Sequence, residues 1–223
     1  MSQDKNTKLK KQIVKICKRL HEKNMLAAAD GNISFRISDK EIWITPSGVM
    51  KAFMDVEDMA CVDIEGKVLK GQPSSEMWMH LEVYKNCEKA KSVIHAHPPY
   101  AIAWSIARPD LTELPCGAMS ELILACGTIP IVPFAIPGTS EMGQNIEPYL
   151  PKHRVMILAR HGALCWGENL QEAHRGMERI EHSSQILYLA NNLGGVTELP
   201  QEKVNLLKDL RQEIVKNMGD IVL

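Results

Sequence analysis

Hydrophobic and polar positions repeat with two different periods along the chain and predict a mixture of helices and strands. Apolar residues at helical spacing, with lysines between them, predict a helix over 8–24. Similar patterns predict further helices over 77–84, 99–107, 169–191 and 201–218. Alternating or short apolar runs predict strands at 34–37, 41–45, 60–64, 67–70, 92–97, 129–135, 154–159 and 163–166. Hairpins mixed with crossovers indicate an α/β protein whose sheet is not purely parallel.

Three local signals refine this outline. Glu65-Gly66 predicts the turn of a hairpin between two of the short strands. Asn169 is expected to cap the long helix that follows it. Ser74 is expected to be the N-cap of the helix through Met77, which would place Glu76 in its first turn.

The composition narrows the class of partner. The chain has 223 residues, of which 45% are hydrophobic, enough to bury the core of one large domain or two small ones. Its 26 basic and 27 acidic side chains give a net charge of -1. This balance gives no electrostatic reason to expect nucleic acid or a membrane surface as a partner. An anionic small molecule would have to be recognised by a shaped pocket.

The N-terminal segment and the cysteines predict a cytoplasmic protein. The first twenty residues are charged but contain no apolar signal core, and no apolar run approaches membrane-spanning length. The six cysteines are scattered and form no C-x-x-C pair. In a reducing compartment the simplest expectation is six buried thiols.

The most specific chemical signal is the pair His95 and His97, on an apolar strand that ends in proline. Residues two apart on a strand point to the same face, so both imidazoles project together. A lone histidine there would be a hydrogen-bonded side chain of the sheet, but a pair favours a metal. A catalytic zinc needs a third protein ligand, and His161, between an apolar strand and Gly162, is the natural one.

The other histidines give weaker signals. All of them fall in helical or charged surroundings and are expected to be exposed; they are His21, His80, His153, His174 and His182. Glu178 and His182 stand four apart on one predicted helix face, but a solvated ion pair explains this spacing better than a metal site does.

Glu76 has two interpretations. A carboxylate at a helix start favours the helix dipole without any further role. Near a metal that polarises a carbonyl, the same carboxylate could act as the general base that removes the adjacent C–H proton.

Three loops of small residues have hydrogen-bond donors that could bind a phosphate without lysine or arginine. Gly31-Asn32, Ser47-Gly48 and Ser74-Ser75 each present backbone N–H groups and small polar side chains. Each alone is only a turn, and a joint role depends on whether they converge in space. The sequence contains no G-x-G-x-x-G, P-loop or G-x-S-x-G motif, so nucleotide binding and serine hydrolysis lack their usual support.

These motifs, in this order, resemble the class II aldolase/adducin-head family, and within it the sugar-phosphate aldolases. The similarity runs from the first helix to about Leu193. It is carried by five motifs: Gly31-Asn32-Ile33-Ser34, Thr45-Pro46-Ser47-Gly48, Pro73-Ser74-Ser75-Glu76, His95-Ala96-His97-Pro98 and His161-Gly162.

The resemblance implies a fold, an assembly and a site. The fold would be a three-layer α/β/α sandwich around a mainly antiparallel sheet, a single domain over 1–223 with a helical tail at 200–223. The assembly would be a homotetramer with active sites at subunit interfaces. Zn²⁺ would be held by His95, His97 and His161, and Glu76 would be the catalytic acid/base. The phosphate of a small phosphorylated sugar would be bound by Gly31, Asn32, Ser47, Gly48, Ser74 and Ser75.

The implied reaction is cleavage of a fuculose-1-phosphate-like ketose 1-phosphate to dihydroxyacetone phosphate and an aldehyde, by an enediolate mechanism. Alternatives on the same scaffold are a methylthioribulose-1-phosphate dehydratase and a pentulose-5-phosphate 4-epimerase. The epimerases carry an acid of different length at the position of Glu76, which disfavours that reaction. A non-catalytic, adducin-like interaction module is the alternative of a different class, but adducins lack the metal histidines.

One departure from the family pattern puts the aldehyde specificity in doubt. Fuculose-phosphate aldolases carry a tyrosine, after the strand with the histidine pair, that protonates the aldehyde oxygen from a neighbouring subunit. The corresponding segment here, 117–122, has no tyrosine. Glu121 could take an acid/base role, although an ordinary helix residue is the better expectation.

Overall fold

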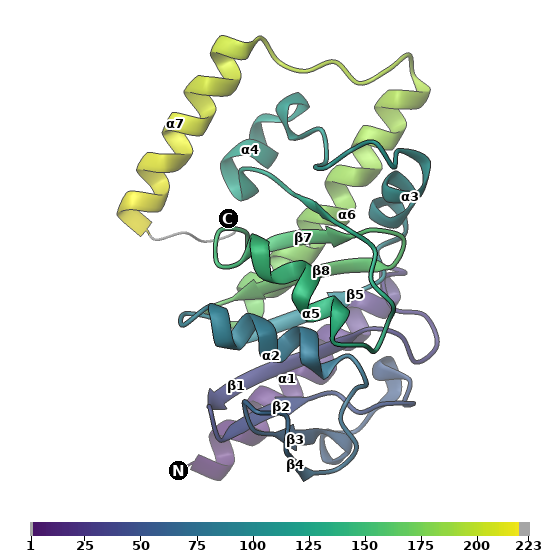
Figure 1. The fold of residues 1–223 in the computed structure, drawn as a ribbon, viewed down its shortest axis with the longest axis vertical. Coiled ribbons are helices and arrows are strands. Elements are labelled where there is room, and N and C mark those ends of the chain that lie inside the picture. Colours follow the sequence, from purple (N-terminus) through teal and green to yellow (C-terminus); the bar gives the residue numbers. More distant parts are fainter. Residues whose placement is uncertain (1, 219–223) are drawn as a thin grey trace.

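A mixed sheet forms the centre of the molecule, and the computed structural model describes residues 2–218 (Figure 1). The strand order is β4-β3-β2-β1-β5-β8-β7-β6. Every neighbouring pair is antiparallel except β6 and β7, which confirms the mainly antiparallel sheet. The strands are β1 (Asn32–Ser38), β2 (Glu41–Ile44), β3 (Ala60–Val62), β4 (Val68–Lys70), β5 (Ser92–Ala96), β6 (Ile131–Val132), β7 (Val155–Leu158) and β8 (Gly162–Gly167).

Helices cover both faces of the sheet, as Figure 1 shows. On one face lie α1 (Ser2–Glu22), α3 (Pro99–Ala107) and α6 (Leu170–Asn192). On the other lie α2 (Met77–Asn86) and α5 (Glu141–Ile146). Two more helices, α4 (Ser120–Cys126) and α7 (Gln201–Met218), pack against each other beside these layers. Short 3-10 turns occupy Lys51–Phe53, Val56–Asp58, Cys116–Ala118 and Glu147–Tyr149.

Alternation along the strands explains why the fold has three layers. In β5, Val93 faces the core under α2 and α5, whereas its neighbour Ile94 faces the core under α1 and α6. Leu164 and Cys165 of β8 divide between the two cores in the same way. A strand buried on both faces needs apolar side chains at consecutive positions, and β7, Val155–Leu158, has four. The α/β/α sandwich is therefore confirmed.

Several predicted elements need correction. The predicted strand at 129–135 contains only the two-residue strand β6, and α4 and α5 are helices that the sequence pattern did not predict. Ser74 is not the N-cap of α2, since the helix begins at Met77 and Glu76 occupies the cap position. By contrast, the predicted cap of α6 is confirmed, because the Asn169 side chain accepts a hydrogen bond from the Glu172 amide.

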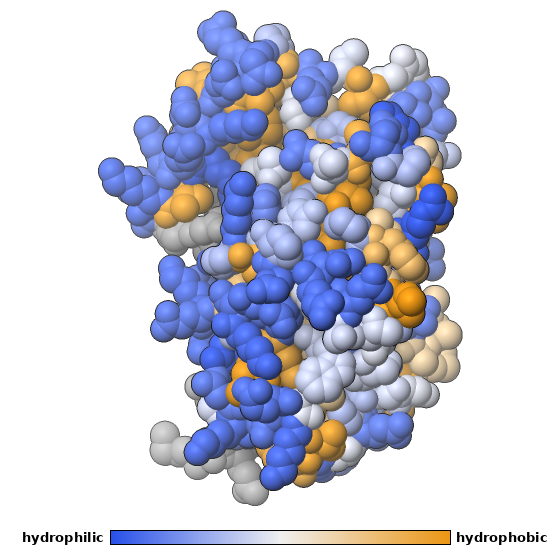
Figure 2. All heavy atoms as spheres, viewed as in Figure 1, coloured by the Kyte–Doolittle hydropathy of each residue, from blue (hydrophilic) through white to orange (hydrophobic). Residues whose placement is uncertain are grey.

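The predicted C-terminal tail, 200–223, contains α7 as expected, and its last part, 219–223, lies outside the described residues. Arg211 of α7 donates hydrogen bonds to the Leu124 and Ala125 carbonyls near the end of α4. Hydrophilic residues cover much of α7 in Figure 2, but Leu206 and Leu210 stay exposed. The organisation as a single domain stays a prediction.

The described residues also bear on the cysteines and on membrane insertion. Five cysteines are buried free thiols, as predicted, but Cys126 is only partly buried. Burial raises the pKa of Cys17, Cys87 and Cys116 to about 12 in each case. Among the helices in the described part of the chain, none is both long enough and apolar enough to cross a membrane.

Candidate active site

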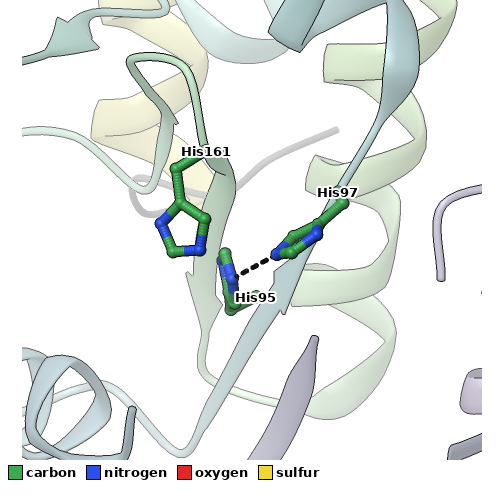
Figure 3. A group of neighbouring side chains, drawn as sticks. All are labelled: His95, His97 and His161. Carbon is green, nitrogen blue, oxygen red and sulfur yellow. Dashed lines mark hydrogen bonds between the residues drawn. The ribbon is translucent and has the colours of Figure 1, made fainter. Parts of the chain in front are cut away.

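Three histidines converge at the end of the central strands. His95 lies in β5, His97 follows the last residue of that strand, and His161 precedes β8, the antiparallel neighbour of β5. Their rings point toward one another in Figure 3. The Nε2 atoms of His95 and His97 are 3.1 Å apart, and one ring nitrogen of each histidine lies within 4.8 Å of the others. The three residues predicted from the sequence are thus brought together.

Neighbouring oxygen atoms orient the rings of His95 and His97, and burial favours their neutral form. His95 Nδ1 donates to the carbonyl oxygen of Ala163 at 2.9 Å, so its Nε2 faces the other rings with a free lone pair. His97 Nδ1 lies 3.5 Å from Asp30 Oδ2. Burial lowers the pKa of His95 to about 3 and also lowers the pKa of His97. A neutral imidazole with its second nitrogen held by an oxygen is the usual form of a metal ligand.

The spacing also fits a zinc ion. Two Zn–N bonds of about 2.0–2.1 Å at the tetrahedral angle place the ligand nitrogens about 3.3 Å apart, close to the 3.1 Å between His95 and His97. Gly162 permits this approach, because a Cβ there would lie 2.5 Å from the Ala96 carbonyl oxygen and 2.8 Å from His95 Cε1. His95 and His97 therefore have the spacing of two zinc ligands, and His161 brings the third imidazole nitrogen within 4.8 Å of theirs.

Glu76 supplies a carboxylate beside the histidines from the N-terminal end of α2. Its Oε1 lies 3.1 Å from His161 Nε2, and its Oε2 lies 3.4 Å from His95 Nε2. Burial by itself raises the pKa of Glu76, but the hydrogen bonds with His161 and Asn32 and the nearby His95 hold it well below its ordinary value. The carboxylate is therefore ionised at neutral pH and close enough to meet a metal or a substrate held by the histidines.

The three predicted phosphate loops converge. The Ser47 amide donates to the Gln72 carbonyl, and the Ser74 amide donates to the Thr45 carbonyl, which joins the second loop to the third. Asn32 Nδ2 donates to Ser74 Oγ at 3.0 Å, which joins the first loop to the third. Gly31, with φ of +70°, passes so close to the His95 carbonyl that a Cβ would lie 2.9 Å from it. The glycine lets this loop reach the histidines.

The converged loops present backbone donors that the protein does not use. Among the described residues, no acceptor takes the amide hydrogens of Gly48, Val49 or Ser75. Gly48 has φ of +70°, and no atom lies within 4 Å of where its Cβ would be, so its surroundings are open. Backbone amides without an internal acceptor, in successive turns, are the usual hydrogen-bond donors of an anion-binding site.

A lysine also lies against these loops, although we expected a site without lysine or arginine. Lys51 is buried, and its Nζ donates to the Ala29 carbonyl at 2.7 Å and to the Val49 carbonyl at 2.8 Å. Burial lowers its pKa, against the opposing effect of Cys17, Asp30 and Glu76. Its ammonium group therefore ties the first loop to the second.

Two of the other histidines are buried and His153 is partly buried, contrary to the prediction. His80 is fully buried in α2, where it bonds to Asn32 and Ser34, and His174 is buried in α6. Met79 and Leu81 flank His80 in the sequence, whereas Arg175 follows His174, and the helix turns both histidines toward the core. The suggested pair of Glu178 with His182 is not a metal site, since Glu178 instead lies 3.1 Å from Arg19 and 3.5 Å from His174.

Three residues of the site are not predicted from the sequence: Asp30, Lys51 and His80. His80 stands four positions after Glu76, a spacing that shares a helix face and could have revealed it. Asp30 and Lys51 stand beside motifs but carry no pattern of their own, because their contacts depend on the convergence of separate loops.

Comparison with known proteins identifies the class of this chain. Residues 11–188 match the family model of the class II aldolase and adducin N-terminal domain, and the chain belongs to this family. An L-fuculose phosphate aldolase of Methanococcus maripaludis strain C5 is 33% identical over 181 residues, which cover 81% of this chain and 96% of the relative. A 3-oxo-tetronate 4-phosphate decarboxylase of Escherichia coli K12 is 26% identical over 183 residues, covering 81% and 86%.

Solved structures support the same assignment of the fold. A structure of an L-fuculose 1-phosphate aldolase matches with a TM-score of 0.81 and 30% identity, covering 92% of this chain and 96% of that one. The expected class II aldolase fold is therefore confirmed. The family includes both aldolases and a decarboxylase among the relatives of this chain.

Proposed function

We propose that this protein is a zinc-dependent lyase that cleaves a carbon–carbon bond of a small phosphorylated sugar or sugar acid. Our first candidate is an aldolase that cleaves a fuculose-1-phosphate-like ketose 1-phosphate to dihydroxyacetone phosphate and an aldehyde. His95, His97 and His161 would hold the zinc, and Glu76 would be the acid/base. Gly31, Asn32, Ser47, Gly48, Ser74 and Ser75 would bind the phosphate.

The observation that carries this proposal is the position of Asn32 between the two halves of the site. Its Nδ2 donates to Glu76 Oε2 at 2.8 Å, beside the histidines, and to Ser74 Oγ at 3.0 Å, in the phosphate loops. Asn32 therefore joins the carboxylate to the loop that carries the unused Ser75 amide. This proximity supports a substrate whose carbonyl and phosphate are close together, as in a ketone that is separated from its phosphate by one methylene group.

Glu76 accounts for the proton transfer at carbon. Bound zinc would supply a Lewis acid that polarises the substrate carbonyl. In the synthetic direction, the ionised Glu76 removes a proton from the hydroxymethyl carbon of dihydroxyacetone phosphate, which leaves the enediolate. The enediolate carbon attacks the aldehyde, and the aldehyde oxygen takes up one proton. Cleavage runs through the same steps in reverse, so protonated Glu76 returns the proton to carbon.

A decarboxylase is the second candidate, and the shared chemistry makes it reasonable. A 3-oxo-tetronate 4-phosphate has its carbonyl one methylene away from the phosphate and a hydroxylated carbon between the carbonyl and the carboxylate. Loss of CO₂ leaves the same enediolate of dihydroxyacetone phosphate, which needs one proton on carbon. It leaves no aldehyde oxygen to protonate, and the segment 117–122 has no tyrosine for that task.

A paired assay tests both candidates. Purified protein should contain about one zinc per chain, and it should release dihydroxyacetone phosphate from a panel of ketose 1-phosphates or from a 3-oxo-tetronate 4-phosphate. An aldehyde formed alongside indicates the aldolase, and CO₂ indicates the decarboxylase. Loss of water instead would support the dehydratase. Protein that cannot be loaded with zinc would refute all of these enzymes.

The assembly and location belong to the same proposal. A homotetramer with its active sites at subunit interfaces would cover exposed apolar side chains such as Phe134 and Ile136. A cytoplasmic location agrees with the free thiols and with phosphorylated substrates. Sedimentation of the zinc-loaded protein should give about four times the 25.0 kDa mass of the chain; a stable monomer with full activity would exclude interface sites.

A further inference from the structure

A buried row of polar side chains runs from the middle of the protein to the candidate site. His80 and Tyr84 lie one turn apart on α2, and Asn32 and Ser34 lie two apart on β1, so each pair shares one face of its element. All four are almost completely buried. Buried polar side chains need hydrogen-bond partners, and these four find them in one another.

The contacts form a continuous chain. Tyr84 Oη lies 2.7 Å from Ser34 Oγ, and Ser34 Oγ lies 2.7 Å from His80 Nδ1. His80 Nε2 lies 2.5 Å from Asn32 Oδ1. Asn32 Nδ2 then reaches Glu76 Oε2 and Ser74 Oγ. The row therefore ends at Glu76, beside the histidines, and at Ser74, in the proposed phosphate loops.

The orientation of the Asn32 amide fixes the direction of every hydrogen bond in the row. Asn32 Nδ2 lies toward Glu76 Oε2 and Ser74 Oγ, and an amide NH₂ group can only donate. Asn32 Oδ1 then faces His80, and His80 Nε2 must carry the hydrogen. His80 is neutral, since burial lowers its pKa to about 3, so its Nδ1 is bare and accepts the hydroxyl hydrogen of Ser34. Ser34 Oγ in turn accepts from Tyr84.

This order of donors also decides what Ser74 offers to a ligand. Ser74 Oγ accepts from Asn32 Nδ2 at 3.0 Å and from the Glu76 amide at 3.3 Å. A hydroxyl oxygen has two lone pairs, and both are then used. The remaining hydroxyl hydrogen of Ser74 must be donated to another group, which suits a phosphate oxygen that only accepts.

We propose that His80 is a positioning residue that acts through Asn32 to hold Glu76 and to make Ser74 a hydrogen-bond donor toward an anionic group of the substrate. This inference rests on the proposed function, which places a phosphate at Ser74. Without the His80 hydrogen, Asn32 Oδ1 loses its donor, and only Glu76 and Ser74 hold the amide group. The turned amide, to which Ser74 would donate its hydrogen instead of to the ligand, then becomes more populated.

The first test is the tautomer of His80 in the wild-type, zinc-loaded protein. Long-range ¹H–¹⁵N correlation spectra should show the neutral form with its hydrogen on Nε2 at every pH from about 5 to 9. A hydrogen on Nδ1, or a doubly protonated ring in this range, would overturn the proposal. This measurement needs no substrate and no substitution, so it holds even if the proposed reaction is wrong.

The second test couples His80 to Ser74 through the binding of inorganic phosphate. In zinc-loaded protein, His80→Leu, which removes the donor to Asn32, should weaken phosphate binding about ten-fold, and it should weaken it less than two-fold when Ser74→Ala is already present. His174→Leu, at a buried histidine outside the row, is the matched control and should leave phosphate binding unchanged. Equal losses with and without Ser74→Ala would overturn the proposal, because His80 would then act on general stability.

Tyr84→Phe adds a graded test of the same row. It removes only the most remote donor, so phosphate binding should fall by less than three-fold and the His80 tautomer should stay the same. A loss as large as that of His80→Leu would show that the row acts as general packing and not through Asn32. If wild-type protein binds zinc but no phosphate, the proposed phosphate site fails, and the role of His80 toward Ser74 fails with it.

Discussion

Replacement of Gly162 by alanine tests whether the turn before β8 sets the geometry of the metal site. Gly162 is buried between the two ligand-bearing segments. A Cβ at this position would lie 2.5 Å from the Ala96 carbonyl oxygen, 2.8 Å from His95 Cε1 and 3.0 Å from His97 Cδ2. One added methyl group thus meets two candidate ligands and the backbone between them.

The size of the effect follows from these distances. Ordinary contacts of a Cβ begin at 3.4 Å, so the Ala96 oxygen would have to move by about 0.9 Å and the His95 ring by about 0.6 Å. Zinc sites hold their ligand distances to about 0.2 Å. We therefore expect Gly162→Ala to weaken zinc binding by about 10–100-fold, as loss of groups that orient the ligands does. Overpacking should also lower the free energy of unfolding of the metal-free protein by about 1–3 kcal/mol.

Competition with a chromophoric chelator measures the zinc affinity, and urea unfolding with excess chelator measures the stability of the metal-free protein. Gly143→Ala is the matched control, because Gly143 is buried in α5 and its added Cβ would meet Glu82 at an ordinary 3.5 Å. That variant should bind zinc normally and gain up to about 1 kcal/mol in helix propensity. If Gly162→Ala binds zinc within two-fold of wild type, the turn does not set the site geometry.

Three further substitutions test separate parts of the structure. Glu76→Gln should retain zinc but lose proton exchange on dihydroxyacetone phosphate by at least about 100-fold; normal exchange, followed by NMR in D₂O, would mean that another residue is the base. Lys51→Met should raise KM for a phosphorylated substrate with little change in kcat, because the two loops that Lys51 joins lose their tie, and an unchanged KM in steady-state assays would contradict this role. Glu172→Ala should lower the free energy of unfolding in urea by about 1.5–3 kcal/mol, since it removes the 2.7 Å partner of buried Arg154, which keeps Glu168 at 3.0 Å; a loss below 1 kcal/mol would show that Glu168 alone is sufficient.

The sequence predicts the layers of the fold because strand and helix patterns report local burial. Val155–Leu158 reads as a strand buried on both faces, and it is one. Short elements are harder, because α5 has only six residues and includes Gly143, so packing against α2 stabilises it more than its own propensity does. Serine is a common N-cap residue, but the hydroxyl of Ser74 accepts a hydrogen bond from Asn32 and belongs to the site.

The same distinction applies to the site. His95 and His97 follow from strand geometry alone, because one element orients both side chains. His161 depends on the pairing of β8 with β5, which the spacing in the sequence does not specify. His80 stands between Met79 and Leu81 in α2, and only the contact of α2 with β1 shows that it is buried against Asn32. Site residues whose contacts join two separate elements can therefore be identified only from the structure.

The missing proton donor for the aldehyde oxygen gives the sharpest remaining test, and Glu121 is the residue to examine. Glu121 is exposed at the start of α4, where Ser120 Oγ donates to its Oε2 at 2.8 Å and lowers its pKa. A carboxyl group with a lowered pKa is ionised at neutral pH and has no proton to give. A general acid contributes about 10²–10⁴-fold, so Glu121→Gln should change kcat by less than about two-fold with either type of substrate, whereas a hundred-fold fall confined to aldol cleavage would identify Glu121 as the acid. An unchanged rate of aldol cleavage would exclude Glu121 as the acid, and the proton for the aldehyde oxygen would then have to come from another group; decarboxylation leaves no aldehyde oxygen and needs no such donor.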